Sequence, residues 1–207
     1  MKFDNIELRP SKKEEVAQAV PLIYSSGPPS FEYVFKNDRV VAQDFLRYAF
    51  VREGGEFSYQ NHYSLYWEDK MVGIGSVFDA KQASGFTFAD AMNIFRFYKF
   101  GSLGPVKSGL KVEKLILLPT KQEIAIAHLG IEPTMQGKGL GTKLIELLKG
   151  KANKTADSIW VLDVSEESPR AKALYDRLGF KVTKKNDSTL KNKYSYVANH
   201  FRMALKD

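Results

Sequence analysis

The chain has 207 residues, of which 43% are hydrophobic and 13% aromatic, and this is enough apolar material for the core of one domain. It contains no cysteine, which excludes a disulfide framework and thiolate chemistry, and its three histidines show no metal-ligand spacing, so we expect no metal site. The net charge of +7 comes from lysines spread along the chain, densest at 181–193, which favours a solvated surface over nucleic-acid binding.

The N-terminal segment predicts a strand followed by a helix. Residues 5–9 have the composition of a short strand. Ser11, with Glu14 three residues later, forms a capping-box signature, and apolar side chains then recur at helical spacing. Pro21 is expected to kink or shorten this helix.

The next part of the chain predicts helices on either side of a hairpin. Two helices are expected near residues 31–35 and 44–51. Strands over 57–67 and 71–78 flank a polar turn and predict an antiparallel pair, in which two glycines weaken the second strand. An apolar helical stripe over 82–98 predicts an inserted helix that ends at a glycine-rich break.

The second half predicts alternating strands and helices. In order, the expected elements are a strand at 124–131, a helix at 140–148, a strand at 158–164, a helix at 169–178, and closing strands at 180–183 and 194–204. Ser168 is the expected N-cap of the second helix, and Gly179 is its expected left-handed C-cap. Because no repeat or linker interrupts the chain, we expect one mixed α/β domain over residues 1–207.

The connection between the strand at 124–131 and the following helix carries three alternate glycines, Gly137, Gly139 and Gly141. At a helix N-terminus the first amide groups have no internal partners and the helix dipole is positive. Glycines without Cβ atoms allow a phosphate group to lie directly on these amides. The segment therefore predicts a phosphate-bearing ligand.

Two common phosphate-binding motifs fit this loop poorly. A Walker A motif needs four residues between its first glycine and Gly-Lys, but six residues separate Gly130 from Gly137, and Gly139 stands where Ser or Thr is required. A dinucleotide fingerprint needs its glycines directly after the strand, and here the third comes one residue early, although Asp163 ends the next strand at a suitable distance. Nucleotide hydrolysis and dinucleotide binding are therefore not favoured.

Residues 136–141, Gln-Gly-Lys-Gly-Leu-Gly, resemble the Q/R-x-x-G-x-G/A signature of the GNAT family of acetyl-CoA-dependent N-acetyltransferases. The lead-in at 131–133, Ile-Glu-Pro, is similar to the family's apolar-x-Pro entry. Residues 171–180, Ala-Lys-Ala-Leu-Tyr-Asp-Arg-Leu-Gly-Phe, resemble its second signature, A-x-x-L-Y-x-x-x-G-F. Two motifs in the right order are far more specific than either alone.

The resemblance implies a mixed, mostly antiparallel twisted sheet that is flanked by helices and splayed at its two central parallel strands. It is closest over residues 123–183, which would form the acetyl-CoA-binding core. Residues 1–122 would supply acceptor-side elements, with an inserted helical segment at about 82–100, and residues 184–207 would supply the closing strand.

The resemblance also implies which residues hold acetyl-CoA. Main-chain groups of Leu129, Gly130 and Ile131 would bond the pantetheine arm between the splayed strands. The amides of the glycine loop would hold the pyrophosphate, with Thr142 and Lys138 adding contacts; the loop residues are Gln136, Gly137, Lys138, Gly139, Leu140 and Gly141. Ser168 stands where the family often has an Asn that contacts the cofactor arm, so that contact differs here.

Tyr175 matches the family's usual general acid, which protonates the CoA thiolate; the alternative is a core aromatic residue beside Leu174. Glu123, at the start of the central strand, occupies the place of the general base in some members, and it could equally be a solvated residue at a strand end. His128 has a suitable pKa range but is expected to pack or to form hydrogen bonds, and a water chain without a dedicated base is a further alternative.

The expected activity is direct transfer of an acetyl group from acetyl-CoA to a primary amine in a ternary complex. The acceptor is a small-molecule amine or a protein amine. Two alternatives remain, a non-catalytic acyl-CoA sensor and an RNA- or ribosome-directed acetyltransferase. The aromatic residues that could line an acceptor pocket, and more often form ordinary core, are Phe31, Tyr33, Phe35, Tyr48, Phe50, Phe86, Phe88, Phe95, Phe97 and Tyr98.

The start of the chain is too polar for a signal peptide, and no apolar run approaches the roughly 20 residues that span a bilayer. We therefore expect a cytoplasmic protein without membrane contact, with a homodimer left open.

Overall fold

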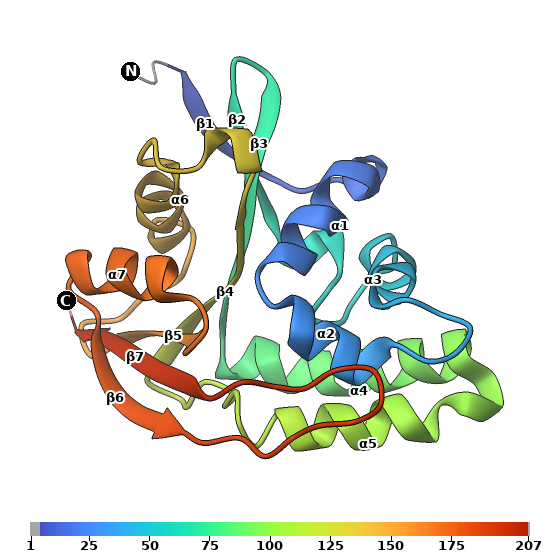
Figure 1. Ribbon diagram of the computed structural model, residues 1–207. Helices are drawn as coiled ribbons and strands as arrows, with labels where there is room; N and C mark the ends of the chain where they lie inside the picture. Colours follow the sequence, from blue (N-terminus) through green and yellow to red (C-terminus); the bar gives the residue numbers. More distant parts are fainter. Residues whose placement is uncertain (1–4, 207) are drawn as a thin grey trace.

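The computed structural model of the protein describes residues 5–206. Its strands form one sheet in the order β1-β2-β3-β4-β5-β7-β6 (Figure 1). Their bounds are β1 Ile6–Pro10, β2 Tyr63–Trp67, β3 Lys70–Asp79, β4 Glu123–Ile131, β5 Ile159–Ser165, β6 Lys181–Asn186 and β7 His200–Lys206. Neighbouring strands are antiparallel except for β4 and β5, which are parallel. The expected mixed, mostly antiparallel sheet is confirmed.

Helices cover both faces of the sheet, with α6 and α7 on one side and α1, α2 and α3 on the other (Figure 1). The helices are α1 Val16–Ser25, α2 Pro28–Phe35, α3 Ala42–Phe50, α4 Ala80–Tyr98, α5 Leu103–Val112, α6 Leu140–Lys149 and α7 Pro169–Arg177. Short 3₁₀ turns lie at Lys13–Glu15, Tyr59–Asn61, Lys99–Gly101 and Pro133–Met135. None of the helices in the described part of the chain is long and apolar enough to cross a membrane.

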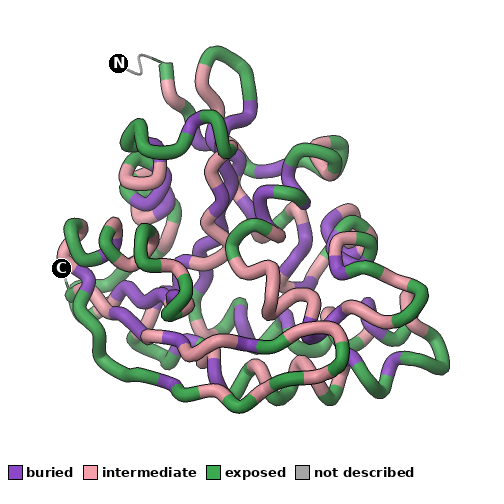
Figure 2. The backbone as a smooth tube through the Cα atoms, in the orientation of Figure 1, coloured by how far each residue is buried: buried purple, intermediate pink, exposed green. Residues whose placement is uncertain are grey.

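Apolar side chains on one face of each helix hold the layers together. Helix α6 buries Leu140, Leu144, Ile145 and Leu148, a spacing that places them on a single stripe against the sheet. Each such side chain contributes about 1.5–3 kcal/mol when it leaves water. Figure 2 shows the buried residues gathered in the central strands and on the helix faces turned toward them.

Strand β3 is buried over eight consecutive residues, because helices cover both of its faces. Its glycines allow close packing and do not interrupt the strand. A Cβ atom on Gly73 would lie 2.7 Å from Cδ1 of Ile131, and one on Gly75 would lie 2.7 Å from Cδ1 of Leu148. The strand is continuous over Lys70–Asp79, and the expected local weakening is seen as a register shift against β4 between Ile74 and Ser76.

The two central parallel strands separate after a short contact. Their register comprises the pairs Glu123 with Ile159, Ile124 with Trp160 and Ala125 with Val161, and the described residues beyond these are not paired with each other. On the other edge of β4, the register with β3 shifts next to His128, whose φ is +54°. The expected splay is present, and it opens a gap beside the second half of β4.

Local side-chain bonds change one expected strand and one expected helix start. The strand expected over 57–67 begins only at Tyr63, because the Ser58 hydroxyl accepts from the Gln60 amide and starts a 3₁₀ turn. The capping box also differs: Glu15 accepts from the Lys12 amide at 3.1 Å, while the Ser11 hydroxyl bonds that of Ser64. Long-range burial of Ser11 overrides its local capping signal.

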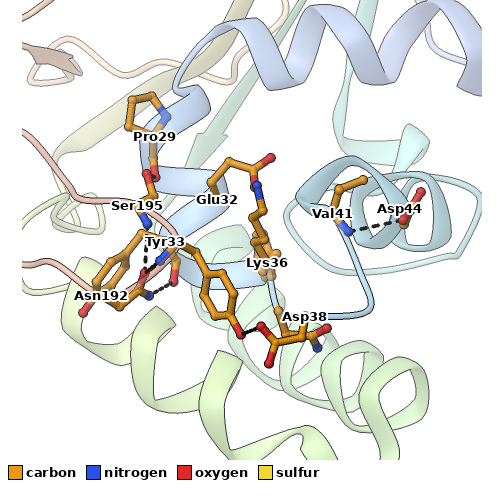
Figure 3. A network of polar contacts seen from close by, with 12 residues as sticks. Pro29, Glu32, Tyr33, Lys36, Asp38, Val41, Asp44, Asn192 and Ser195 are labelled. Atoms are coloured by element: carbon orange, nitrogen blue, oxygen red, sulfur yellow. Dashed lines mark hydrogen bonds and ion pairs between the residues drawn. The ribbon is translucent and has the colours of Figure 1, made fainter.

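The closing strand expected over 194–204 begins only at His200, because the loop before it is bound to α2 (Figure 3). The side-chain amide of Asn192 donates to the Tyr33 carbonyl at 2.9 Å, and the Ser195 hydroxyl donates to the Pro29 carbonyl at 2.9 Å. We call residues 187–199 the C-terminal strap. It lies along α2 and α5 in Figure 1.

The inserted helix is present as α4, but its aromatic residues do not form one pocket. Phe86 is buried at the start of α4, whereas Phe88 and Phe95 are 75% and 60% exposed. A 3₁₀ turn at Lys99–Gly101 follows α4, and the rest of the expected glycine-rich break lies in the first turn of α5, a helix that the sequence pattern did not predict. Pro105 lies in the first turn of α5, where its missing amide proton costs no helical bond.

Candidate functional site

The glycine loop adopts backbone angles that favour glycine. Gly137 and Gly139 have φ of +75° and +88°, in the left-handed region that is costly for residues with a Cβ atom. Gly139 is the N-cap of α6, and its carbonyl accepts from the Lys143 amide. The amides of the first turn of α6 therefore have no partner within the helix and are available to an anion.

A cavity of about 830 Å³ lies between the start of α6, α7 and the second half of β4. Expected cofactor-binding residues that line it are Leu129, Ile131, Gln136, Gly137, Gly139, Leu140, Gly141, Thr142 and Ser168. Tyr175 lines the same cavity. The fold thus brings the two sequence motifs to one site.

Two expected residues do not line the cavity. Gly130 packs against α1, since a Cβ atom there would lie 2.3 Å from the Leu22 carbonyl oxygen. Its lack of a side chain serves helix packing. The Lys138 ammonium lies 3.6 Å from the sulfur of Met135.

Sequence reasoning missed two cationic residues of the cavity, Arg170 and Arg177. They are seven positions apart on α7 and so lie on one side of the helix, and this spacing is the signal that could have identified them. Further lining residues are Met135, Leu144, Ile145, Glu167, Pro169, Ala171, Ala173 and Leu174. Helix-end amides, two arginines and an apolar wall suit a ligand with phosphate groups and an apolar arm.

Tyr175 lies near the end of α7 and is 8% exposed. Its ring packs edge-on against Phe180, with 6.3 Å between ring centroids. Burial raises the pKa of the Tyr175 phenol to about 12. The phenol is therefore protonated at neutral pH and can donate a proton into the cavity.

Ser168 is the N-cap of α7 through its carbonyl, which accepts from the Lys172 amide at 3.0 Å. Its side chain makes no capping bond within the described chain. The Ser168 hydroxyl is therefore not needed to start the helix, and its position in the cavity wall makes it available to a ligand.

Glu123 lies at the closed end of the parallel pair, away from the residues that line the cavity. Its carboxylate accepts from Nη2 of Arg202 at 3.1 Å and from the Thr120 amide at 2.8 Å. Arg202 also binds Asp163 through Nη1 at 2.6 Å. The structure does not bring Glu123 together with Tyr175, and it gives the Glu123 carboxylate a structural partner.

Residues 115–198 match the family model described as "Acetyltransferase (GNAT) domain". A comparison with curated proteins finds no match.

Solved structures with this fold include an N-acetyltransferase from Staphylococcus aureus Mu50, with a TM-score of 0.69 and 16% identity over 96% of this chain and 100% of that one. A polyamine N-acetyltransferase from Drosophila melanogaster has a TM-score of 0.58 and 16% identity over 98% and 100%. The yncA protein of Salmonella typhimurium, solved with its cofactor acetyl-CoA, has a TM-score of 0.54 and 16% identity over 98% and 94%. At these identities the likeness shows the fold.

Proposed function

We propose that the protein transfers an acetyl group from acetyl-CoA to a primary amine, since residues 115–198 match the model of the GNAT acetyltransferase domain. One observation carries the proposal. The glycine-lined N-terminus of α6 and the buried phenol of Tyr175 share one cavity beside the splayed end of β4. A phosphate-binding end and a proton donor in one cavity suit acyl transfer from a CoA thioester.

The binding residues follow from the cavity wall. The amides of Gly139, Leu140 and Gly141 would hold the pyrophosphate, and Arg170 and Arg177 would add charge-assisted bonds. The remaining proposed contacts come from Leu129, Ile131, Gln136, Gly137, Thr142 and Ser168. Gly130 and Lys138 are left out of this set, because neither lines the cavity.

Acetyl-CoA supplies an acetyl thioester, and the overall step forms a C–N bond, breaks the C–S bond and releases one proton from an ammonium acceptor. Tyr175 donates its phenolic proton to the departing sulfur. An ordinary thiol pKa is about 8.5, well below the value of about 12 for Tyr175. Full proton transfer from the Tyr175 phenol to the departing thiolate is therefore unfavourable on its own. The phenol recovers a proton from the attacking nitrogen as it donates its own to the sulfur.

The proposed acceptor is a small, cationic primary amine. Support comes from solved structures that share this fold, which include an agmatine N-acetyltransferase and a polyamine N-acetyltransferase. A ribosomal-protein-S18-alanine N-acetyltransferase also shares the fold, so a peptide amine belongs in the test.

The test is an acetyl-CoA-dependent thiol-release assay with agmatine, spermidine, an aminoglycoside, free amino acids and a peptide with a free N-terminus. We expect release with at least one amine and the matching mass increase of 42 Da on that amine, which is the mass of an acetyl group in place of a proton. Tight binding of acetyl-CoA without release for any amine would favour a sensor over an enzyme.

A further inference from the structure

A line of polar groups runs from the loop before β2 to the central strand β4. Nδ1 of His62 lies 2.9 Å from the Ser58 carbonyl oxygen, and Nε2 of His62 lies 3.1 Å from Nδ1 of His128. Nε2 of His128 lies 3.3 Å from a carboxylate oxygen of Glu56. The two imidazole rings are stacked, 5.2 Å between centroids and 14° apart. We call these four residues the histidine chain.

The contacts of the histidine chain fix where its protons lie. A carbonyl oxygen only accepts, so Nδ1 of His62 carries a proton and donates to Ser58. His62 is 1% exposed, and burial lowers its pKa to about 3, so its ring is neutral. Nε2 of His62 then accepts, and Nδ1 of His128 donates to it. In its neutral form His128 therefore has its lone pair on Nε2, the atom that lies beside the Glu56 carboxylate.

His128 lies at the place where β4 leaves β5. It is three residues beyond the last pair of the parallel register and directly before Leu129, which lines the cavity. Its ring packs against those of Phe57 and Phe31, with 5.2 Å and 6.2 Å between ring centroids, on the side of the sheet that α2 covers. A φ of +54° costs a non-glycine residue about 1–2 kcal/mol. Such strain is retained where a side chain must be held in one place.

Carboxylates surround the outer end of the histidine chain. The Glu56 amide donates to Asp90 of α4 at 2.9 Å. Burial, followed by the charge of Glu56, raises the pKa of Asp90 to about 7, and the same two causes raise the pKa of Glu113. These groups repel one another, and a cation beside Glu56 would relieve the repulsion. An ammonium group is the charge type that suits this place.

We propose that His128 is the general base that takes a proton from the acceptor ammonium, with Glu56 and His62 as its positioning residues, and that the acceptor approaches from the Phe31 and Phe57 side. This inference rests on the proposed acetyl transfer. The N–H bond of the ammonium breaks and an N–H bond forms at Nε2 of His128. The proton then passes to Glu56, whose side chain is 33% exposed, and on to solvent. The neutral amine is left as the nucleophile.

The kinetic test compares His128→Gln with His200→Gln, using the best amine of the acceptor panel between pH 6 and 10. His200 is the matched control, since it is buried on β7 and bonds the Ala198 carbonyl. We expect His128→Gln to lower kcat/KM by about 10²–10⁴-fold at pH 7 and to recover toward wild type at high pH, where the amine is already neutral. Its acetyl-CoA affinity and melting temperature stay close to wild type. A His128→Gln enzyme with the wild-type rate and pH profile would overturn the proposal.

Positions of the protons are tested without any acceptor. The chain has three histidines, so long-range ¹H–¹⁵N spectra of the ¹⁵N-labelled protein resolve each ring. The single histidine variants assign the signals, because each lacks the signals of one ring. We expect neutral His62 and neutral His128 both to carry the proton on Nδ1, and His62→Leu to move the His128 proton to Nε2 and lower kcat without changing the KM for acetyl-CoA. A wild-type His128 protonated on Nε2 contradicts the proposed base.

The two proposals fail differently. Wild-type protein that releases no thiol with any amine of the panel contradicts the acetyl transfer itself. Wild-type protein that acetylates an amine while His128→Gln does so equally well contradicts only the role of His128.

Discussion

The Nη2 atom of Arg202 lies 3.1 Å from the carboxylate of Glu123, so one bond reaches from β7 across β5 to β4. The same guanidinium binds Asp163 on β5 and the Leu117 carbonyl. Its side chain is 6% exposed, and it holds two carboxylates at the end of the sheet where β4 and β5 are still paired. This cluster secures the closed end of the splay and leaves the open end to the cavity.

Glu123→Gln tests the structural role of Glu123. The substitution removes a charge-assisted bond to a buried guanidinium, which costs about 1–3 kcal/mol of unfolding free energy. Since Glu123 does not line the cavity, we expect kcat to stay within about twofold of wild type. Urea denaturation and the thiol-release assay measure the two effects. Glu14→Gln, at an exposed position, is the control. A large loss of kcat in Glu123→Gln would show that Glu123 takes part in catalysis and would contradict a purely structural role.

Asp163→Asn tests the buried cluster through pH. Burial is the largest influence on Asp163 and raises its pKa to about 6, although Arg202 opposes the shift. The pKa of an Asp in the unfolded chain is about 3.9, so the folded chain binds the proton of Asp163 more tightly than the unfolded chain does. The stability that this tighter proton binding contributes is lost as the pH rises through 6. Asn does not titrate, so the stability of Asp163→Asn relative to wild type should rise by up to about 3 kcal/mol between pH 4 and 7.5. Urea denaturation at several pH values measures this difference, and a constant difference would contradict the prediction.

Tyr175→Phe tests the proton donor. Loss of the phenolic proton should lower kcat by about 10²–10⁴-fold, because the thiolate then leaves without protonation. Acetyl-CoA affinity, measured by calorimetry, should change little, since the ring and its contact with Phe180 remain. The control is Tyr66→Phe, whose hydroxyl bonds Glu15 outside the cavity. An unchanged rate in Tyr175→Phe would exclude this tyrosine as the general acid.

Gly139→Val tests the phosphate-binding loop. A β-branched residue at φ +88° is strained and displaces the first amides of α6. We expect acetyl-CoA affinity to fall at least tenfold, with a smaller loss of stability. The matched control is Gly85→Ala on α4, where a Cβ atom meets nothing within 4 Å and helix propensity improves. Equal acetyl-CoA affinity in the two variants would contradict the proposed cradle.

Asn192→Ala tests the C-terminal strap. Asn192 donates to the Tyr33 carbonyl and accepts from the Tyr194 and Ser195 amides, so the substitution removes three bonds at once. Amide hydrogen exchange in residues 187–199 should become at least tenfold faster, while exchange in β5 is unchanged. Lys191→Ala, on the same loop, serves as the control. Uniform acceleration throughout the chain would show global destabilisation and contradict a local role.

The amino-acid sequence by itself determined the part of the site that lies in one continuous segment. Gly137, Gly139 and Gly141 predicted a phosphate-binding helix start, and Ser168 and Tyr175 on the next helix fell in the same cavity. Strand and helix periodicity suffices there, because each element is contiguous and its apolar face is set by local spacing.

The tertiary structure alone decided which residues meet across long separations in the chain. Gly130 packs on α1, Arg202 takes up Glu123, and His62 meets His128 across 66 residues. The strap likewise binds α2 more than 150 residues away and so delays the start of β7. Such contacts depend on burial and on the register of neighbouring strands, which local propensity does not encode. The residues of the proposed donor end could therefore be predicted from the sequence, whereas those of the proposed acceptor end required the fold.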